Sequence, residues 1–149
     1  MEKTISFKTY LDIAEDDFGF LLKCYENNIE ANALTSISQN ACEKYMKHII
    51  DTYYNPGNDL EMVHNKEDIL RSHNLGVLMK FLKQNLGVSY SKSTDMLLKS
   101  INGYYFNTRY PGSDSFKVDF EDIELCIEAI KSCRKETFEI INSLDDESK

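Results

Sequence analysis

Apolar residues that recur every three or four positions constrain the fold of this chain more than any other feature. Such spacing places apolar side chains on one face of an α-helix, where they can pack against other helices. The first of these segments runs from Tyr10 to Ile29, and the second runs from Leu34 to Tyr53 and stops before Pro56. No segment alternates polar and apolar residues as a half-buried strand does. An all-helical fold is therefore predicted.

Capping residues and a polar connection delimit a third segment. Residues 55–71 are mostly polar and are predicted to form a connection with a short turn at residues 60–63. Ser72 can accept a hydrogen bond from the first backbone amides of a helix, and Gly87 can end one. A third helix is predicted between these two residues.

Two further helices are predicted in the rest of the chain. Thr94 can cap a short fourth helix that includes Tyr105 and ends before Pro111, because proline disfavours helical geometry in the residue before it. Asp119 can cap a fifth helix, whose apolar residues continue to Ile141.

Length and composition fit a single domain. A chain of 149 residues buries about two thirds of the surface that it exposes when unfolded. Six Gly and two Pro are too few for the many tight turns of a β-sandwich or barrel. Residues 1–149 are therefore predicted to form one antiparallel bundle of about five helices, with residues 144–149 as a frayed tail.

The net charge of −8 is distributed unevenly. Residues 1–42 carry three basic and seven acidic side chains, residues 43–110 carry nine and seven, and residues 111–149 carry five and eleven. The overall charge argues against broad attraction to nucleic acid or to an anionic membrane. A bound anion is expected in the middle third, which alone has a positive balance.

The cysteines and histidines do not have the spacing of a metal site. No C-x-x-C pair or H-x-x-x-H motif is present, so no metal and no cofactor are predicted. Four cysteines fall among apolar residues and are predicted to be buried, reduced thiols: Cys24, Cys42, Cys126 and Cys133. No window reaches the roughly 18 apolar residues of a membrane span, and the acidic N-terminus is unlike a signal peptide. A soluble, cytoplasmic protein with no membrane partner is expected.

Three clusters carry most of the candidate chemistry: "SQNACEKYMKHI" at 38–49, "RSHNLGVLMKFL" at 71–82 and "RYP" at 109–111. In this order and spacing, with "IAEDDFGFLLKCYENN" at 13–28, they resemble the HEPN (higher eukaryotes and prokaryotes nucleotide-binding) family of helical domains. The resemblance covers nearly the whole chain. It implies a helical bundle that often forms two-fold dimers with a groove near the dimer seam. It also implies a nucleotidyltransferase partner in a toxin–antitoxin-like or stress-response pair.

The resemblance also directs attention to a ribonuclease motif. Many HEPN domains are metal-independent ribonucleases in which an Arg is followed, after four to six residues, by a His. An imidazole can move the proton of the RNA 2′-hydroxyl while a guanidinium holds the phosphate. All three histidines here precede Arg109, none follows Arg134, and the positions at this spacing after Arg71 are residues 76–78, Gly-Val-Leu. The motif is absent from this sequence.

Arg109 lies in an aromatic segment, which allows two interpretations of its role. In the structural one, Tyr105 or Tyr110 stacks on the guanidinium and Asp114 pairs with it, so that the loop before the last helix is held in place. In the functional one, Arg109 faces a groove and binds phosphate, while Tyr104, Tyr105 or Tyr110 offers a flat surface to a base.

Other candidate ligand-binding residues lie at the start of the third helix and on the second. His73 and Asn74 either pack against a neighbouring helix or line the same groove as Arg109. Lys44 is a candidate contact because the family repeats an acidic-lysine step at this position. Glu43 and Lys47 are four residues apart and are predicted to form an ion pair on an exposed face.

Three functions remain open on the sequence. The first is a non-catalytic or degenerate HEPN module that binds a nucleotide, RNA or a partner protein, as a homodimer. The second is a ribonuclease that uses Arg109 with His73 or Tyr110, which requires these side chains to converge within reach of one phosphate. The third is a purely structural helical module, in which Arg109 is buried and paired.

Overall fold

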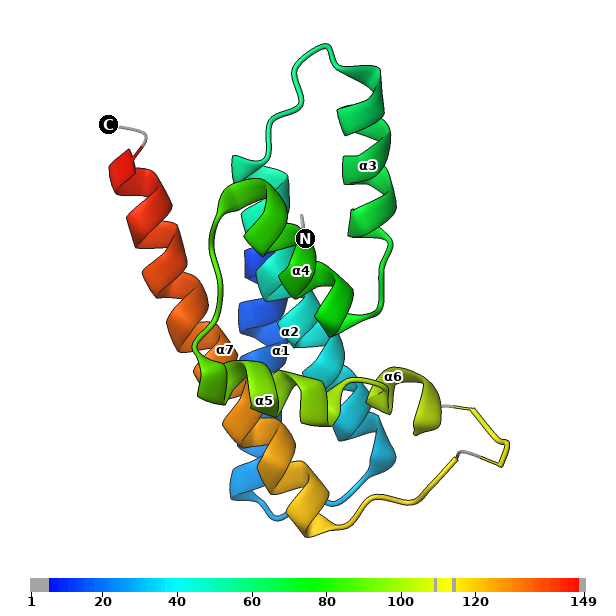
Figure 1. The fold of residues 1–149 in the computed structure, drawn as a ribbon. Coiled ribbons are helices and arrows are strands. Elements are labelled where there is room, and N and C mark those ends of the chain that lie inside the picture. Colours follow the sequence, from blue (N-terminus) through cyan, green and yellow to red (C-terminus); the bar gives the residue numbers. More distant parts are fainter. Residues whose placement is uncertain (1–5, 109, 114, 148–149) are drawn as a thin grey trace, which may run out of the picture.

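The computed structural model describes residues 6–108, 110–113 and 115–147 of the chain. Within them the chain forms helices joined by loops, with no β-strand, which confirms the predicted all-α bundle (Figure 1). The helices are α1 (Tyr10–Glu26), α2 (Asn32–Tyr53), α3 (Leu60–Leu70), α4 (Leu75–Leu86), α5 (Lys92–Ile101), α6 (Tyr104–Asn107) and α7 (Phe120–Glu147). None of these helices is both long enough and apolar enough to cross a membrane.

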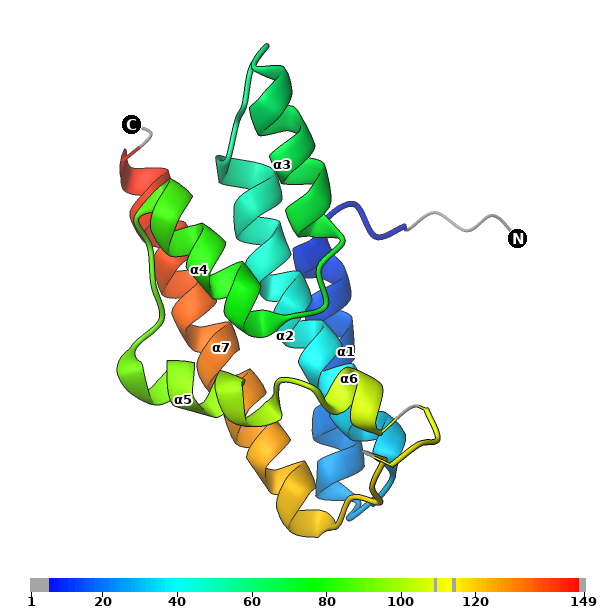
Figure 2. The same ribbon diagram turned by 45° about the vertical axis from the view of Figure 1, so that its right-hand side comes forward.

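α2 is the central helix of the bundle and contacts each of the others. It lies beside α1 and α7, while α4 packs over α2 and α5 crosses α7 (Figure 2). Its inward positions, such as Ala41, Tyr45 and Ile49, have no exposed surface. Burial of these side chains provides the main stabilisation of the fold, because burying a large apolar side chain contributes about 1.5–3 kcal/mol. The predicted burial of all four cysteines is confirmed, and each is a free thiol.

The N-caps of two helices differ from the predicted ones. Asn74, not Ser72, caps α4: its Oδ1 accepts a hydrogen bond from the Val77 amide at 3.1 Å. Ser91, not Thr94, caps α5 and accepts from the Thr94 amide at 3.3 Å. In both cases the sequence offers several capping residues within four positions, and packing of the helix selects among them.

Two helices of the middle region were not predicted as such. α3 has eleven residues where a short turn was expected, and Asp59 caps it by accepting from the Met62 amide at 3.2 Å. Ile69 is its one buried residue, so its sequence lacks a full apolar stripe. The predicted fourth helix is divided, because α5 ends at Ile101 and Gly103 has a φ of 108°, in the left-handed region.

The two ends of the bundle also differ from the predictions. α1 ends at Glu26, three residues before Ile29, and Asn28 takes a left-handed φ of 56°. α7 continues to Glu147, into the segment for which fraying was predicted. The Tyr53 hydroxyl donates a hydrogen bond to Asp145 and so joins the end of α2 to the last turns of α7. Burial, followed by that hydrogen bond, raises the pKa of Tyr53 to about 12.

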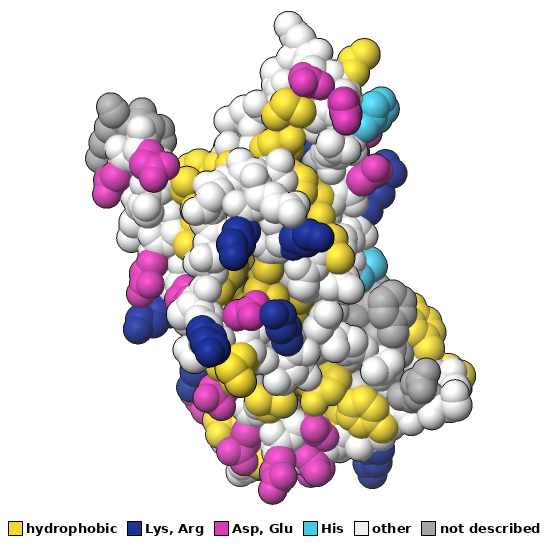
Figure 3. Space-filling view, viewed as in Figure 1, with side chains coloured by type: hydrophobic (Ala, Val, Ile, Leu, Met, Phe, Trp, Pro, Cys, Tyr) yellow, Lys and Arg dark blue, Asp and Glu magenta, His cyan; other side chains and the backbone are white. Residues whose placement is uncertain are grey.

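Acidic and basic side chains gather in different places on the face drawn in Figure 3. Acidic side chains gather over the start of α7, whereas Lys side chains gather over α4 and α5 (Figure 3). The basic part of this face comes from the middle third of the chain, the third with the positive balance.

Candidate functional site

Five polar residues from three parts of the chain form a cluster, here called the polar cluster: Gln39, Glu43, His73, Asn74 and Asn102. Gln39 lies at its centre on α2 and has no exposed surface. Its Nε2 donates to the His73 carbonyl at 2.8 Å, and its Oε1 accepts from the Gly103 amide at 3.0 Å. One amide side chain therefore joins α2 to the loop before α4 and to the linker between α5 and α6.

Glu43 and His73 form a carboxyl–imidazole pair within the polar cluster. Glu43 Oε2 lies 3.3 Å from His73 Nδ1, and the Glu43 side chain is fully buried whereas that of His73 is 40% exposed. Burial raises the pKa of Glu43, although the hydrogen bond with His73 and the charge of Lys47 act in the opposite direction. The predicted ion pair of Glu43 and Lys47 on an exposed face is wrong, because both residues are buried under the helices that surround α2.

Asn74 and Asn102 extend the polar cluster to the start of α4. Asn102 Oδ1 accepts from the Leu75 amide at 3.0 Å, and Asn102 Nδ2 donates to Asn74 Oδ1 at 3.2 Å. Both bonds tie the end of α5 to the first turn of α4, where backbone amides would otherwise lack partners. The chain that leaves Asn102 leads directly into α6 and the aromatic segment.

A second set of contacts holds the loop of residues 108–118, which contains the Arg-Tyr-Pro motif. Asn32, the first residue of α2, donates to the Phe116 carbonyl at 2.8 Å and accepts from the Val118 amide at 2.8 Å. Thr35, one turn further on, donates to Thr108 Oγ1 at 3.2 Å. The start of α2 therefore fixes both ends of this loop.

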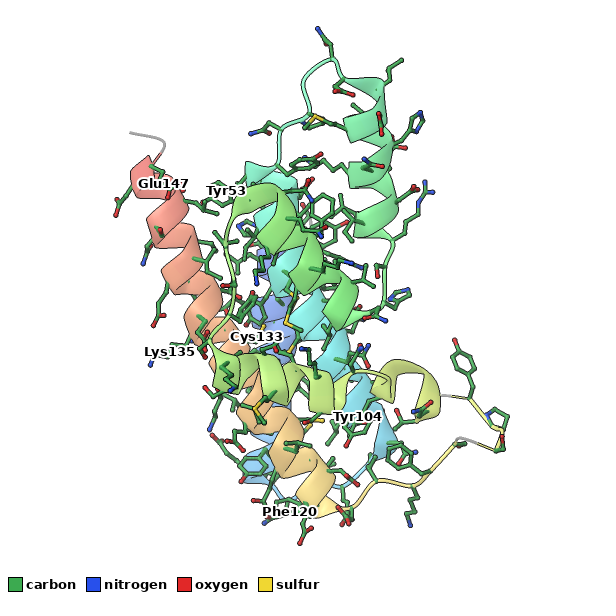
Figure 4. All side chains as sticks on the ribbon, viewed as in Figure 1. Tyr53, Tyr104, Phe120, Cys133, Lys135 and Glu147 are labelled. Carbon is green, nitrogen blue, oxygen red and sulfur yellow. The ribbon has the colours of Figure 1, made fainter. Side chains whose placement is uncertain are left out.

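Aromatic side chains complete the base of the loop. The Tyr104 and Phe116 rings lie 5.6 Å apart between centroids. The Tyr104 hydroxyl donates to Asp122 Oδ1 on α7 at 3.2 Å, and Figure 4 shows this ring below α6. Burial and the nearby Asp122 carboxylate raise the pKa of Tyr104, so this phenol stays neutral at physiological pH.

The Asn32 contacts make a prediction for the mobility of the loop. Replacing Asn32 with alanine removes the acceptor of the Val118 amide, so this amide is expected to exchange with deuterium about tenfold faster. Hydrogen exchange followed by NMR measures this, with Asn40→Ala on the same helix as the matched control. Unchanged exchange at Val118 in Asn32→Ala would show that the Asn32 hydrogen bonds do not hold the loop.

The structure brings two of the site residues predicted from the sequence together and places a third one elsewhere. Arg109 and the side chain of Tyr105 lie outside the described residues. Tyr110, on the loop, is 52% exposed. His73 and Asn74 both belong to the polar cluster, next to the linker that leads into the aromatic segment. Lys44 lies apart from them, because its Nζ faces α1 and is 3.9 Å from Asp17 Oδ2.

Gln39, Asn102 and Asn32 were missed by the sequence reasoning. Their partners are main-chain atoms more than 25 positions away, and such pairs leave no local pattern. One signal was present for Gln39: it lies four residues before Glu43, on a helical face that also carries the apolar residues Cys42 and Met46. Two polar residues on a buried face of a helix indicate a polar network inside the bundle.

The polar cluster can position groups and exchange a proton. Its amides are hydrogen-bonded to the backbone, whereas a histidine held at Nδ1 by a carboxylate can transfer a proton through Nε2. Among the described residues, no group of three or more His, Cys, Asp or Glu side chains is arranged to hold a metal ion. Within the polar cluster, the His73–Glu43 pair is the part that can move a proton.

The raised pKa of Glu43 predicts a dependence of stability on pH. A carboxyl whose pKa is higher in the folded state makes the protein more stable below its unfolded pKa, near 4.5, and less stable as the pH rises through the folded pKa. The stability of the native chain relative to Glu43→Gln is expected to fall over that window. Urea unfolding from pH 4 to 8 measures it, with exposed Glu128→Gln as control. A flat difference would contradict the burial of an ionisable Glu43.

Comparison with known proteins places the chain in a family. A family model described as HEPN domain matches residues 62–141, which include α4 to α6, the loop 108–118 and most of α7. The comparisons with curated proteins and with solved structures found no match. The model covers more than half of the chain, and the matched region contributes His73, Asn74 and Asn102 to the polar cluster. This chain is therefore a member of the HEPN domain family.

Proposed function

We propose that this HEPN domain binds a nucleotide or RNA without cleaving it. The observation that supports the proposal most is that the side chains of the polar cluster make structural contacts. Both ends of the Gln39 amide are hydrogen-bonded to the backbone, and the buried Glu43 carboxyl contacts His73. The absent Arg–His spacing of the family's ribonucleases agrees with this. The ligand is expected at the loop 108–118, where Tyr110 is exposed and Arg109 follows the fixed Thr108.

A ribonuclease is the second candidate, and one observation favours it. His73 Nδ1 faces a buried carboxylate, which is the arrangement that orients a general base in many hydrolases, and the imidazole is partly exposed. This candidate also requires the Arg109 guanidinium to reach the same phosphate.

A cleavage and binding assay separates the two candidates. The native chain, Arg109→Ala and His73→Gln are incubated with a labelled single-stranded RNA in metal-free buffer, and nucleotide and RNA affinities are measured in parallel. The proposal expects no cleavage by any of the three and about tenfold weaker binding for Arg109→Ala, since an Arg–phosphate contact is a charge-assisted pair. Cleavage by the native chain that disappears in both variants would establish the ribonuclease. Absence of both binding and cleavage would favour a purely structural module.

We further propose that the domain acts as a two-fold homodimer beside a nucleotidyltransferase, in a toxin–antitoxin-like or stress-response pair. Membership of the HEPN family supports this proposal. Sedimentation equilibrium tests the dimer. A small nucleotidyltransferase gene adjacent to this one, whose product purifies with the domain, would support the partner. A monomeric domain that does not bind this product would contradict both the dimer and the partner.

A further inference from the structure

A cavity of about 450 Å³ lies between α4 and α5, and no residue of the loop 108–118 lines it. Its wall contains four lysines and one carboxylate: Lys80, Lys83, Lys92, Lys99 and Asp95. Met79 and the buried Tyr90 also line it. Figure 3 shows these basic side chains around a hollow on the face covered by α4 and α5. No residue of the polar cluster lines this cavity, so it is a separate site.

Helical spacing explains why the lysines meet here. Lys80 and Lys83 are three residues apart on α4, and Lys92 and Lys99 are two turns apart on α5, so each pair occupies one face of its helix. The two helices pack against each other and bring these faces to one cavity. Asp95 offsets one of the four charges, because it pairs with Lys99 at 2.9 Å.

The charge of this lining is unusual for the protein. Four ammonium groups against one carboxylate give a local excess of three positive charges on a chain whose net charge is −8. The ammonium groups repel one another, and a concave surface with apolar parts strengthens their combined field. A multivalent anion in the cavity would relieve this repulsion. Lysines bind phosphate as mobile point charges, without the fixed geometry that an arginine imposes.

The shape of the surroundings favours a compact anion over an extended strand. The volume is that of a small-molecule pocket, and the lysines surround it instead of forming a stripe. Ser89 lines both this cavity and a neighbouring one whose wall includes Glu136 and Glu139. These carboxylates would repel the phosphates of a nucleic acid that continued in that direction.

We propose that the cavity lined by Lys80, Lys83, Lys92 and Lys99 binds a compact ligand with a chain of phosphate groups. A nucleoside triphosphate and a free polyphosphate share this chemistry. The inference goes beyond the proposed function, because it adds a second anion site that is separate from the ligand expected at the loop 108–118.

Calorimetric titration of the full chain tests the site. The probes are ATP, inorganic tripolyphosphate and a single-stranded RNA, each at about 50 and 200 mM salt in Mg²⁺-free buffer. The test variant is Lys83→Gln with Lys92→Gln. The matched control is Lys23→Gln with Lys135→Gln, which removes the same charge at two exposed helical positions outside the cavity. ¹H–¹⁵N NMR of the native chain locates the shifted amides.

The expected result is binding of ATP and tripolyphosphate that weakens with salt and falls about tenfold in the test variant but less than twofold in the control. Amide shifts are expected in α4 and α5. A clear preference for ATP would identify a nucleotide as the source of the phosphates, and equal affinities would identify a free polyphosphate. All four lysines are exposed, so the variants should fold, and circular dichroism checks this.

Three results would overturn the site. Nucleotide binding that both double variants retain equally would leave the proposed function at the loop 108–118 standing and would reject a phosphate site in this cavity. Binding of RNA alone would do the same and would favour an extended ligand elsewhere on the protein. Absence of binding by all three probes would reject the site and the proposed function together.

Discussion

Replacing Gln39 with alanine is expected to lower the free energy of unfolding by about 3 kcal/mol, because it removes two hydrogen bonds to the backbone and leaves a cavity in place of a fully buried side chain. The His73 carbonyl and the Gly103 amide both lose the Gln39 amide, which is fully buried. The loss should also loosen the linker between α5 and α6, since the Gly103 amide anchors it. Urea unfolding at neutral pH measures the stability, and hydrogen exchange at Gly103 measures the local effect.

Gln84→Ala on α4 is the matched control for this experiment. It makes the same chemical change at an exposed position, where a change within about 0.5 kcal/mol is expected. A loss in Gln39→Ala no larger than that in Gln84→Ala would show that the polar cluster does not hold the three segments together. A large loss combined with unchanged nucleotide binding would separate this structural role from the ligand site.

Replacing Glu15 with alanine is expected to cost about 2–3 kcal/mol, since one carboxylate serves both a buried phenol and a guanidinium. Glu15 accepts from the Tyr45 hydroxyl at 2.6 Å and from Arg134 Nε and Nη2 at 2.7 and 3.0 Å. The Arg134 guanidinium also lies 4.9 Å from the Phe18 ring centroid and 5.1 Å from that of Phe138. These contacts join α1, α2 and α7.

The pH dependence gives a second measurement of the Glu15 interaction. Desolvation alone would raise the pKa of Glu15, but hydrogen bonds from Arg134 and Tyr45 lower it overall. A carboxyl with a lowered pKa contributes stability above its unfolded pKa, near 4.5, and loses it as the pH falls through the folded pKa. The cost of Glu15→Ala should therefore shrink in acid. Exposed Glu128→Ala is the control, and a cost independent of pH would contradict the ion pair.

The Glu15–Arg134 contacts show how an arginine in this protein is held by aromatic rings and a carboxylate, as the structural interpretation of Arg109 expects. A guanidinium held by aromatic rings and paired with a carboxylate was proposed for Arg109, and the described residues contain this arrangement at Arg134. Phe138 lies one turn after Arg134 on α7, whereas Phe18 comes from α1, so the complete arrangement forms only when α1 packs against α7.

The two classes of error in the fold prediction have different physical causes. α3 was taken for a connection because it buries little apolar surface, and the spacing of apolar residues detects only buried faces. Glu43 and Lys47 were placed on an exposed face because their spacing suits an ion pair, although α2 is covered on nearly every side. A helix at the centre of a bundle must bury some polar residues, and the sequence of that helix does not say which ones.

The all-helical class, the positions of α1, α2 and α7 and the family all follow from the sequence, because apolar spacing and helix-ending residues act over short distances along the chain. The polar cluster, the hydrogen bonds from Asn32 to the loop 108–118 and the cavity with four lysines depend on which helices pack together. Tertiary structure alone decided these features: a hydrogen bond from Gln39 to Gly103, or a shared field of Lys83 and Lys92, exists only after packing brings distant segments within a few ångströms.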